Sequence, residues 1–300
     1  MTERRRKHSL AHYAIDVPRQ ILSHRDPISL KLGRLAAAMV FQTRKRLGAP
    51  PAVVESEGIR IHGRHDAGGV SNLVYFGRRF EYDEILFVER YLRAGDRVVD
   101  GGANIGLFSL VVADVVGPTG KVWAYEPSSN TNDRLAENVE LNALSQIIPR
   151  RAALGPTQTT MSFTMGWDVS NGLVDDASSS GPVETVDVVP LDDELDGEGN
   201  LALVKLDLEG GELGALRGAA TLLSEGRIDV LLVEAFDHQM RRVGDTRAEL
   251  LDELRGHGYA FFDYKADQAG GLQPADPPPD GNFLALRQEA IPEVRARLGI

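Results

Sequence analysis

A carboxylate followed by a glycine-rich turn is the first pattern in the chain that could do chemistry. Residues 97–106 read RVVDGGANIG, so an apolar run ends at Asp100 and glycines follow at Gly102 and Gly106. Glycines let the backbone approach a ligand closely, and the start of the helix expected over residues 107–116 offers free N–H groups. In doubly wound sheets, nucleotides bind where such a turn follows a strand. The segment therefore predicts a site for a nucleotide-like ligand.

Two cofactors are compatible with this turn. Dinucleotides such as NAD are bound by the pattern G-x-G-x-x-G, whereas this chain has D-x-G-x-N-x-G, with Asn104 after the second glycine. S-adenosylmethionine needs no pyrophosphate site, and Asp100 can instead receive the ammonium group of its methionine part. Glu126, twenty residues beyond Gly106, ends the next apolar run and can accept hydrogen bonds from ribose hydroxyls. Glu126 supports a ribose in either cofactor, while the turn favours the methyl donor.

A pair of carboxylates ends a later apolar run. Residues 203–212 read LVKLDLEGGE, which places Asp207 and Glu209 two positions apart and Glu212 in the first turn of the next helix. Side chains two apart on a strand point to the same face, and ligands of doubly wound sheets sit beyond the carboxyl ends of the strands. We therefore expect these acids at the same crevice as the glycine-rich turn.

Together these motifs resemble the FkbM family of S-adenosylmethionine-dependent methyltransferases. The resemblance rests on four ordered segments between about residues 80 and 286, which are DGGANIGLFS at 100–109, EP at 126–127, VVPLDD at 188–193 and KLDLEGGE at 205–212 with LRG at 216–218. Gly101 departs from the pattern, because the family usually carries an apolar residue there. The first 75 or so residues lie outside the resemblance.

The resemblance implies a class I, Rossmann-like α/β fold, with a doubly wound seven-stranded sheet whose last strand is reversed. It also implies methyl transfer to a hydroxyl group of a small molecule, commonly a sugar or a natural product. Glu126 would hold the ribose, and Ala152 and Ala153 would line the adenine. The residues that would bind the cofactor are Asp100, Gly102, Ala103, Asn104, Gly106, Ser109, Glu126, Pro127, Ala152, Ala153 and Asp207.

An alcohol nucleophile must lose its proton as the new bond forms, which calls for a positioned base or a metal ion. The candidate bases are Asp207, His238 and Asp237, although Asp237 could equally cap the helix that follows it. Glu209 and Trp167 are the candidate contacts to the acceptor. A magnesium site formed by Asp207, Glu209 and Asp237 is an alternative that we do not favour.

The elements that must position these residues alternate as in a parallel sheet flanked by helices. Seven strands are expected, over residues 98–100, 122–125, 147–152, 203–207, 230–233, 259–262 and 283–286. Residues 157–195 interrupt this order with a hairpin of strands at 159–165 and 183–189. A loop over residues 266–280, rich in glycine and proline, is expected to cover one end of the sheet.

The N-terminal region is predicted to be an extension, residues 1–76, ahead of a methyltransferase domain over 77–300. A polar tail over residues 1–26 precedes an amphipathic helix over 28–47, whose apolar positions are Ile28, Leu32, Leu35 and Met39. Short strands are expected over residues 53–76 and a helix over 82–92.

Charge divides the chain in the same way. Residues 1–50 contain 11 lysines and arginines against 3 aspartates and glutamates, a net of +8, which leaves −19 for the rest of a chain whose formal charge is −11. No aromatic stacking platform accompanies the basic residues, so we do not favour a nucleic acid partner. The polar start does not read as an export signal, and no apolar run has the length of a membrane span.

The chain contains no cysteine, which excludes disulfides, thiolate zinc sites and a cysteine nucleophile. We expect a cytoplasmic enzyme, and homo-oligomerisation stays open. Two alternatives to a methyltransferase remain at this stage. One is an NAD-dependent oxidoreductase on the same fold, and the other is a protein that binds the cofactor without turnover.

Overall fold

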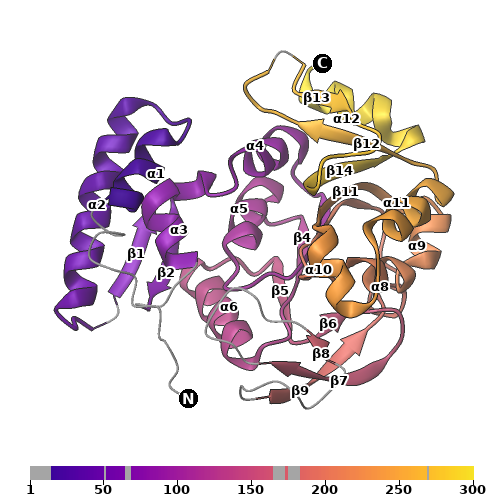
Figure 1. Ribbon diagram of the computed structural model, residues 1–300, viewed down its shortest axis with the longest axis horizontal. Helices are drawn as coiled ribbons and strands as arrows, with labels where there is room; N and C mark the ends of the chain where they lie inside the picture. The colour runs from indigo at the N-terminus through magenta and orange to yellow at the C-terminus, as the bar shows by residue number, and fades with distance from the viewer. Residues whose placement is uncertain (1–14, 51, 65–68, 165–172, 175–182, 269) are drawn as a thin grey trace. The chain divides into compact units, whose positions relative to one another are not determined.

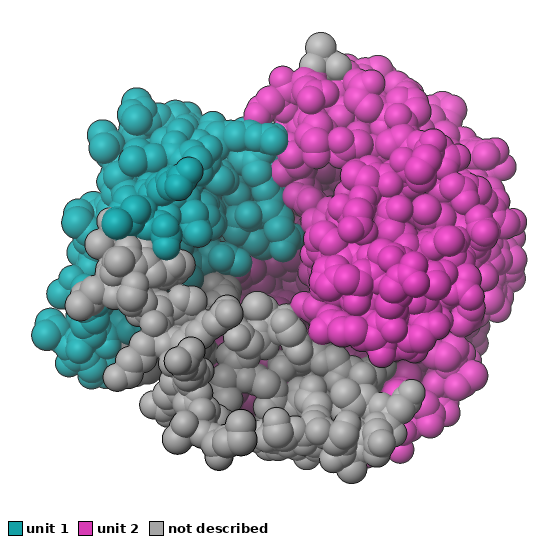
Figure 2. Space-filling view, in the orientation of Figure 1, with its two compact units in different colours: residues 1–82 teal, residues 83–300 magenta. Residues whose placement is uncertain are grey.

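The computed structural model describes residues 15–50, 52–64, 69–164, 173–174, 183–268 and 270–300. The chain divides into two compact units, Met1–Tyr82 and Asp83–Ile300 (Figure 2). The roles given above to an extension and a methyltransferase domain stay predictions. None of the described helices combines the length and apolarity that crossing a membrane requires.

The first unit is a small helical group with one hairpin. Its elements are α1 (Val17–Ser23), α2 (Ile28–Arg46), β1 (Ala52–Ser56), β2 (Ile59–Gly63), α3 (Gly69–Phe76) and the 3₁₀ turn η2 (Gly77–Arg79) (Figure 1). The expected helix α2 and the strands β1 and β2, which pair antiparallel, are present. Two expectations are wrong. Part of the predicted tail folds as α1 because Val17 and Ile21, one helical turn apart, are buried, and α3 replaces a predicted strand.

The buried face of α2 also differs from the expected one. Ile28, Leu32 and Met39 are each more than 60% exposed, and the buried side chains are instead Arg34, Ala38 and Phe41. A buried ion pair explains the difference for Arg34, whose guanidinium contacts the carboxylates of Asp26 and Glu57. The apolar spacing therefore predicted the helix correctly but not the face that packs.

The second unit is built on one large sheet. Its strands are β3 (Arg97–Gly101), β4 (Lys121–Tyr125), β5 (Ile147–Arg150), β10 (Leu201–Leu206), β11 (Ile228–Ala235), β12 (Tyr259–Tyr264), β13 (Leu272–Pro274) and β14 (Gly281–Arg287). The order across the sheet is β13-β12-β14-β11-β10-β3-β4-β5. Neighbours from β11 to β5 are parallel, and β14 runs antiparallel to both β11 and β12. The seven predicted strands and the reversed last strand are confirmed.

One loop expectation is corrected here. Residues 272–274 of the loop predicted over 266–280 form the edge strand β13, which pairs with the last residues of β12, and the expected cover over one end of the sheet stays a prediction. Tyr264 pairs with Leu272, and the two strands run antiparallel. The large sheet therefore has eight described strands rather than seven.

Helices lie against this sheet (Figure 1). They are α4 (Tyr82–Tyr91), α5 (Leu107–Val116), α6 (Ser129–Asn142), α7 (Leu191–Glu194), α8 (Glu212–Arg217), α9 (Ala220–Ser224), α10 (Asp237–Met240), α11 (Arg247–Gly256) and α12 (Ile291–Leu298). Val99, Val204, Leu231 and Val233 pack with the buried leucines of α8, α9 and α11 in one core. Alternate strand positions point to opposite faces, so Val98 and Asp100 face away from that core.

A second sheet forms within the interruption. Its order is β6-β9-β7-β8, with β6 (Ala153–Leu154), β7 (Thr159–Thr164), β8 (Leu173–Val174) and β9 (Val183–Val189). The predicted hairpin of β7 and β9 is confirmed as an antiparallel pair. The strand predicted over residues 147–152 stops at Arg150, and the chain crosses to β9 at Ala153. Pro149 fits this edge of the large sheet, because proline cannot donate to a further strand.

Candidate active site

Backbone hydrogen bonds fix the glycine-rich turn to the ends of both neighbouring strands. The N–H groups of Gly102 and Ala103 donate to the carbonyl of Tyr125 at the end of β4, at 3.0 and 2.9 Å, and the N–H of Asp207 donates to the carbonyl of Gly101 at 3.1 Å. Gly102 has a φ of +83°, and a Cβ there would lie 1.9 Å from the carbonyl oxygen of Asp207. Only glycine can occupy this position without displacing the backbone.

The rest of the turn leads into α5 through two left-handed residues. Asn104 has a φ of +51°, and its side-chain oxygen accepts from the N–H of Ile105 at 2.7 Å. Gly106 has a φ of +89° and precedes the first residue of α5. Asparagine tolerates this conformation because its short side chain can bond locally to the backbone. The predicted asparagine and glycines thus have a structural role in shaping the turn.

Asp100 is a fully buried carboxylate at the end of β3. The hydroxyl of Ser109 donates to its Oδ2 at 2.5 Å, while Oδ1 is buried and has no hydrogen-bond partner among the described residues. Burial raises the pKa of Asp100, although the ammonium of Lys205 and the bond from Ser109 oppose the rise. An unpartnered buried oxygen is unfavourable. A cationic or hydrogen-bonding ligand at Oδ1 would remove that penalty.

Glu126 lies beyond the end of β4 and braces the turn. Its Oε2 accepts from the N–H of Asn104 at 3.1 Å, and its Oε1 accepts from the N–H of Ser128 at 3.0 Å. Burial raises its pKa to about 7 despite these two bonds. Each carboxylate oxygen has two lone pairs, so both keep the capacity to accept a further hydroxyl.

Asp207 follows β10 and belongs to a group of three ionisable side chains, with Lys205 and Glu234. Lys205, buried on β10 opposite Asp100, donates from Nζ to Oδ2 of Asp207 at 2.8 Å. Burial alone would raise the pKa of Asp207, but the ammonium of Lys205 and a hydrogen bond with Glu234 outweigh it and lower the pKa. Burial, followed by the contact with Asp207, raises the pKa of Glu234 to about 9. At neutral pH Asp207 is therefore ionised, Glu234 is protonated, and one proton lies between them.

The two other acids of this motif have different surroundings. Glu212 is buried, and its Oε1 accepts from the N–H groups of Leu208 and Gly210 at 2.8 and 3.2 Å, which closes the turn after β10. Burial raises its pKa to about 7. Glu209 is half-buried with a φ of +54°, and its Oε2 accepts from the side-chain amide of Gln239 at 2.7 Å.

Asp237 and His238 begin α10, beyond the end of β11. Asp237 forms an ion pair with Arg241 at 2.6 Å, which lowers its pKa, and its side chain is 41% exposed. His238 is exposed and its ring lies 5.6 Å from that of Phe236. Both residues lie at the expected edge of the sheet, but neither contacts Asp207 through any of the hydrogen bonds described above.

The residues predicted to surround the adenine and the acceptor are placed only in part. Ala152 and Ala153 are buried just beyond β5, and the N–H groups of Ala152 and Glu126 both donate to the carbonyl of Arg150 at 3.0 Å. The half-buried Pro127 follows Glu126. Trp167 lies outside the described residues. The adenine and acceptor assignments therefore stay predictions.

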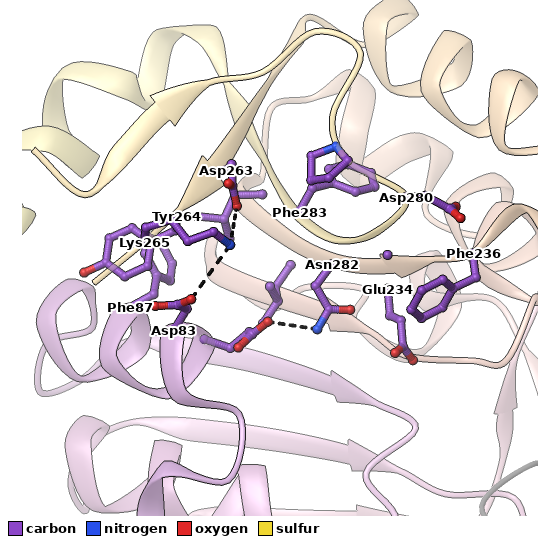
Figure 3. Close-up of a pocket in the computed structure, with 15 residues that line it drawn as sticks. Asp83, Phe87, Glu234, Phe236, Asp263, Tyr264, Lys265, Asp280, Asn282 and Phe283 are labelled. Carbon is purple, nitrogen blue, oxygen red and sulfur yellow. Dashed lines mark hydrogen bonds and ion pairs between the residues drawn. The ribbon is translucent and has the colours of Figure 1, made fainter. Parts of the chain in front are cut away.

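A cavity of about 350 Å³ lies beside this group, where β11 and β12 end and β14 begins (Figure 3). It is lined from four segments, residues 83–87, 232–236, 263–265 and 279–284, and we refer to it as the β11–β14 cavity. Lys265 contacts Asp263 at 3.0 Å and Asp83 at 3.8 Å on one side of it. Glu234 and Phe236 line it on β11 and just beyond.

Sequence reasoning did not assign a role to Lys205 or Glu234. Lys205 is the single charged residue of β10, and Glu234 directly follows the apolar run 230–233 of β11, and these were the available signals. Among the described residues, no group of three or more histidine, aspartate or glutamate side chains could hold a metal ion. Asp207, Glu209 and Asp237 therefore do not form such a group in this geometry.

The strand order with a reversed β14, and the glycine-rich turn at its centre, define a class I methyltransferase fold. A family model described as the methyltransferase FkbM domain matches residues 100–261, more than half of the chain. The chain belongs to this family.

Two curated relatives are similar over about half of the chain. The hexuronic acid methyltransferase AglP of Haloferax volcanii is 30% identical over 159 residues, which cover 52% of this chain and 62% of AglP. The methyltransferase sdnD of Sordaria araneosa is 30% identical over 177 residues, which cover 47% of this chain and 68% of sdnD. The match thus spans less than two thirds of AglP.

Among solved structures, a methyltransferase FkbM from Methylobacillus flagellatus is similar, with a TM-score of 0.44 and 18% identity over 84% of this chain and 58% of that chain. An S-adenosylmethionine-dependent O-methyltransferase from Thermotoga maritima has a TM-score of 0.40 and 14% identity, over 81% of this chain and 80% of that chain.

Proposed function

We propose that this protein transfers the methyl group of S-adenosylmethionine to a hydroxyl group of a small molecule, a sugar or another natural product. One observation carries the proposal. Three neighbouring strands, β10, β3 and β4, end in the carboxylates Asp207, Asp100 and Glu126 around one glycine-rich turn. S-adenosylmethionine is a cationic ligand with an ammonium group, a sulfonium and a ribose diol, which are the groups that carboxylates recognise.

The residues present fit this cofactor. Asp100 Oδ1 is the buried oxygen without a partner, and it would receive the ammonium group of the methionine part. Glu126 would accept the ribose hydroxyls while it continues to hold the turn. A dinucleotide fits less well for two reasons. Its pyrophosphate would approach two buried acids, and the turn lacks the third glycine of the usual dinucleotide-binding pattern.

When bound, S-adenosylmethionine supplies an electrophilic methyl group on a cationic sulfur. The protein must then align a hydroxyl with that group and accept the hydroxyl proton. Asp207 is the proton acceptor that the geometry favours. Lys205 keeps it ionised, and Glu234 connects it to the β11–β14 cavity. Asp237 and His238 are less favoured, since one is paired with Arg241 and the other is exposed.

Titration with S-adenosylmethionine and with NAD, followed by isothermal calorimetry, tests the cofactor. We expect binding of S-adenosylmethionine only, weakened about tenfold or more in Asp100→Asn. The exposed Asp252→Asn serves as the matched control and should bind as the unaltered protein does. Binding of NAD alone would overturn the proposal in favour of the oxidoreductase.

Methyl transfer is tested by following S-adenosylhomocysteine release with a panel of sugars, polyols and polyketide alcohols. We expect turnover with a hydroxylated acceptor, and a loss of about 100-fold or more in Asp207→Asn with donor binding retained. Donor binding without turnover on any acceptor would favour a protein that holds the cofactor without catalysis.

A further inference from the structure

The β11–β14 cavity contains one residue, Glu234, that also contacts the proposed proton acceptor. We propose that this cavity binds the methyl acceptor, that Glu234 passes the acceptor's hydroxyl proton to Asp207, and that the cavity takes polyhydroxylated acceptors without a carboxylate. The inference rests on the proposed function and adds to it the acceptor site, a catalytic residue and the acceptor's charge.

Strand register places Glu234 between the cavity and Asp207. Leu206 of β10 pairs with Val233 of the parallel strand β11, so Asp207 and Glu234 are the next residues on adjacent strands. Glu234 lines the cavity, as Figure 3 shows, and Asp207 does not. An acceptor in the cavity therefore reaches Asp207 through Glu234.

The charged groups that face Glu234 suit a proton relay. Asp207, Lys205 and Glu209 act on its carboxyl group from the β10 side, and Asn282 is its register partner on β14. The protonated Glu234 hydrogen-bonds to the ionised Asp207 and keeps an oxygen that can accept from a hydroxyl. Asp207 itself does not line the cavity.

The transfer balances as a concerted step. The acceptor O–H bond breaks as its proton binds the free oxygen of Glu234, and the proton already on Glu234 moves to Asp207. The electron pair left on the acceptor oxygen forms the new O–C bond, while the pair of the C–S bond stays on sulfur. Both carboxyl groups are then neutral, and one proton returns to solvent before the next turnover.

The lining of the cavity fits a sugar or polyol. Phe236, Tyr264 and Phe283 offer apolar ring surfaces, and polar groups between them can fix hydroxyls. Figure 3 shows Phe236 beside Glu234 and Tyr264 at the opposite end with Lys265. A mixture of ring surfaces and a few convergent polar groups is typical of small-molecule sites.

The charge of the lining disfavours an anionic acceptor. Lys265 contacts both Asp263 and Asp83, and the lining also includes the acids Glu84 and Asp280. Glu84 accepts a hydrogen bond from the side-chain amide of Asn282 at 2.8 Å. Asp280 accepts from the N–H of Asp237 and lies 4.0 Å from Arg247, which does not line the cavity. An acceptor carboxylate would meet net negative charge, whereas hydroxyls can donate to these oxygens.

Glu234→Gln tests the relay, because the amide can still donate to Asp207 but cannot pass a proton. We expect kcat to fall at least about 100-fold, with the KM for the acceptor and the affinity for S-adenosylmethionine within about threefold. Glu234→Asp, which keeps a carboxyl group, should recover part of kcat. The surface variant Asp252→Asn is the control. Unchanged kcat in Glu234→Gln overturns the relay.

Matched acceptors test the site and its charge. Hexopyranosides and their uronic acid counterparts are compared by kcat/KM, and we expect the neutral sugar to be favoured at least about tenfold, with that ratio falling in Glu84→Gln and Asp280→Asn. Equal or faster turnover of the uronic acids overturns the charge assignment. Absence of turnover with every neutral sugar and polyol, while S-adenosylmethionine still binds, overturns the acceptor class. Loss of donor binding itself would instead contradict the proposed function.

Discussion

The two halves of the sheet edge hold their acids in different ways. At the ends of β3 and β4, the proposed donor half, backbone N–H groups hold the turn and Glu126, while Asp100 accepts from the hydroxyl of Ser109. At the ends of β10 and β11, the acceptor half, Asp207 and Glu234 contact other side chains and hold one proton between them. Glu126 is thus held by backbone N–H groups, whereas Asp207 and Glu234 interact through their side chains.

The halves also differ in how the chain builds them. The donor half comes from one continuous turn at residues 100–106 and a single acid on the next strand. The acceptor half gathers four segments that are far apart in sequence.

The largest effect is expected at Gly102, where the backbone of the two halves meets. Gly102→Ala combines a positive φ with a Cβ placed 1.9 Å from the carbonyl oxygen of Asp207, and should lower the free energy of unfolding by about 3 kcal/mol or more. Gly197→Ala is the matched control, with a φ of +74° and open space, and should lower it by about 1 kcal/mol. Urea denaturation measures both, and equal effects would contradict the close approach.

Glu212 is an acid of the acceptor half that is fixed by backbone N–H groups, as in the donor half. Burial raises its pKa to about 7, above its ordinary value of 4.5, so the folded protein binds this proton more tightly than the unfolded chain. Its contribution to stability is present below about pH 4.5 and is lost as the pH rises through about 7. The free energy of unfolding should therefore fall between about pH 5 and pH 8. In Glu212→Gln this fall should be smaller by about 2 to 3 kcal/mol. Chemical denaturation at both pH values measures this, and an unchanged difference would show that Glu212 does not titrate in this range.

Glu126 should make donor binding depend on pH. Burial raises its pKa to about 7, and the ionised form accepts ribose hydroxyls better than the protonated one. The affinity for S-adenosylmethionine should therefore rise up to about tenfold between about pH 6 and pH 8. In Glu126→Gln this rise should be lost, and calorimetry at several pH values measures it. The same rise in both proteins would assign it to another group.

The smallest effects are expected at the start of α10. Asp237 is an exposed partner of Arg241, so Asp237→Asn should change turnover less than about threefold, and His238→Asn should do the same. Asp207→Asn, in the same half, should by contrast lose about 100-fold or more of turnover. A larger loss in His238→Asn than in Asp207→Asn would move the base from β10 to α10.

The donor half was predictable from sequence because its determinants are local. Asp100, Gly102 and Glu126 each end or follow one strand, and the apolar runs place those strands correctly. The eighth strand β13 was not predicted, since its pairing with β12 depends on a three-residue match formed only in the folded chain. The packed face of α2 was missed because a buried Arg34 pair overrides apolar spacing.

In the acceptor half, only Asp207 was predictable from the sequence. Asp207 stands out after an apolar strand, but Glu234 becomes significant only when β11 aligns it with Asp207. Lys205 likewise lies opposite Asp100 only once β10 has paired with β3. Strand register is a tertiary property, so local spacing does not reveal these contacts.

Calorimetric titration of S-adenosylmethionine into the unaltered protein, Asp100→Asn and Glu234→Gln tests the division of the site most directly. We predict that the unaltered protein binds the donor, that Asp100→Asn binds it at least about tenfold more weakly, and that Glu234→Gln binds it within about twofold of the unaltered protein. Loss of donor binding in Glu234→Gln with retention in Asp100→Asn would contradict the assignment of donor and acceptor to the two halves.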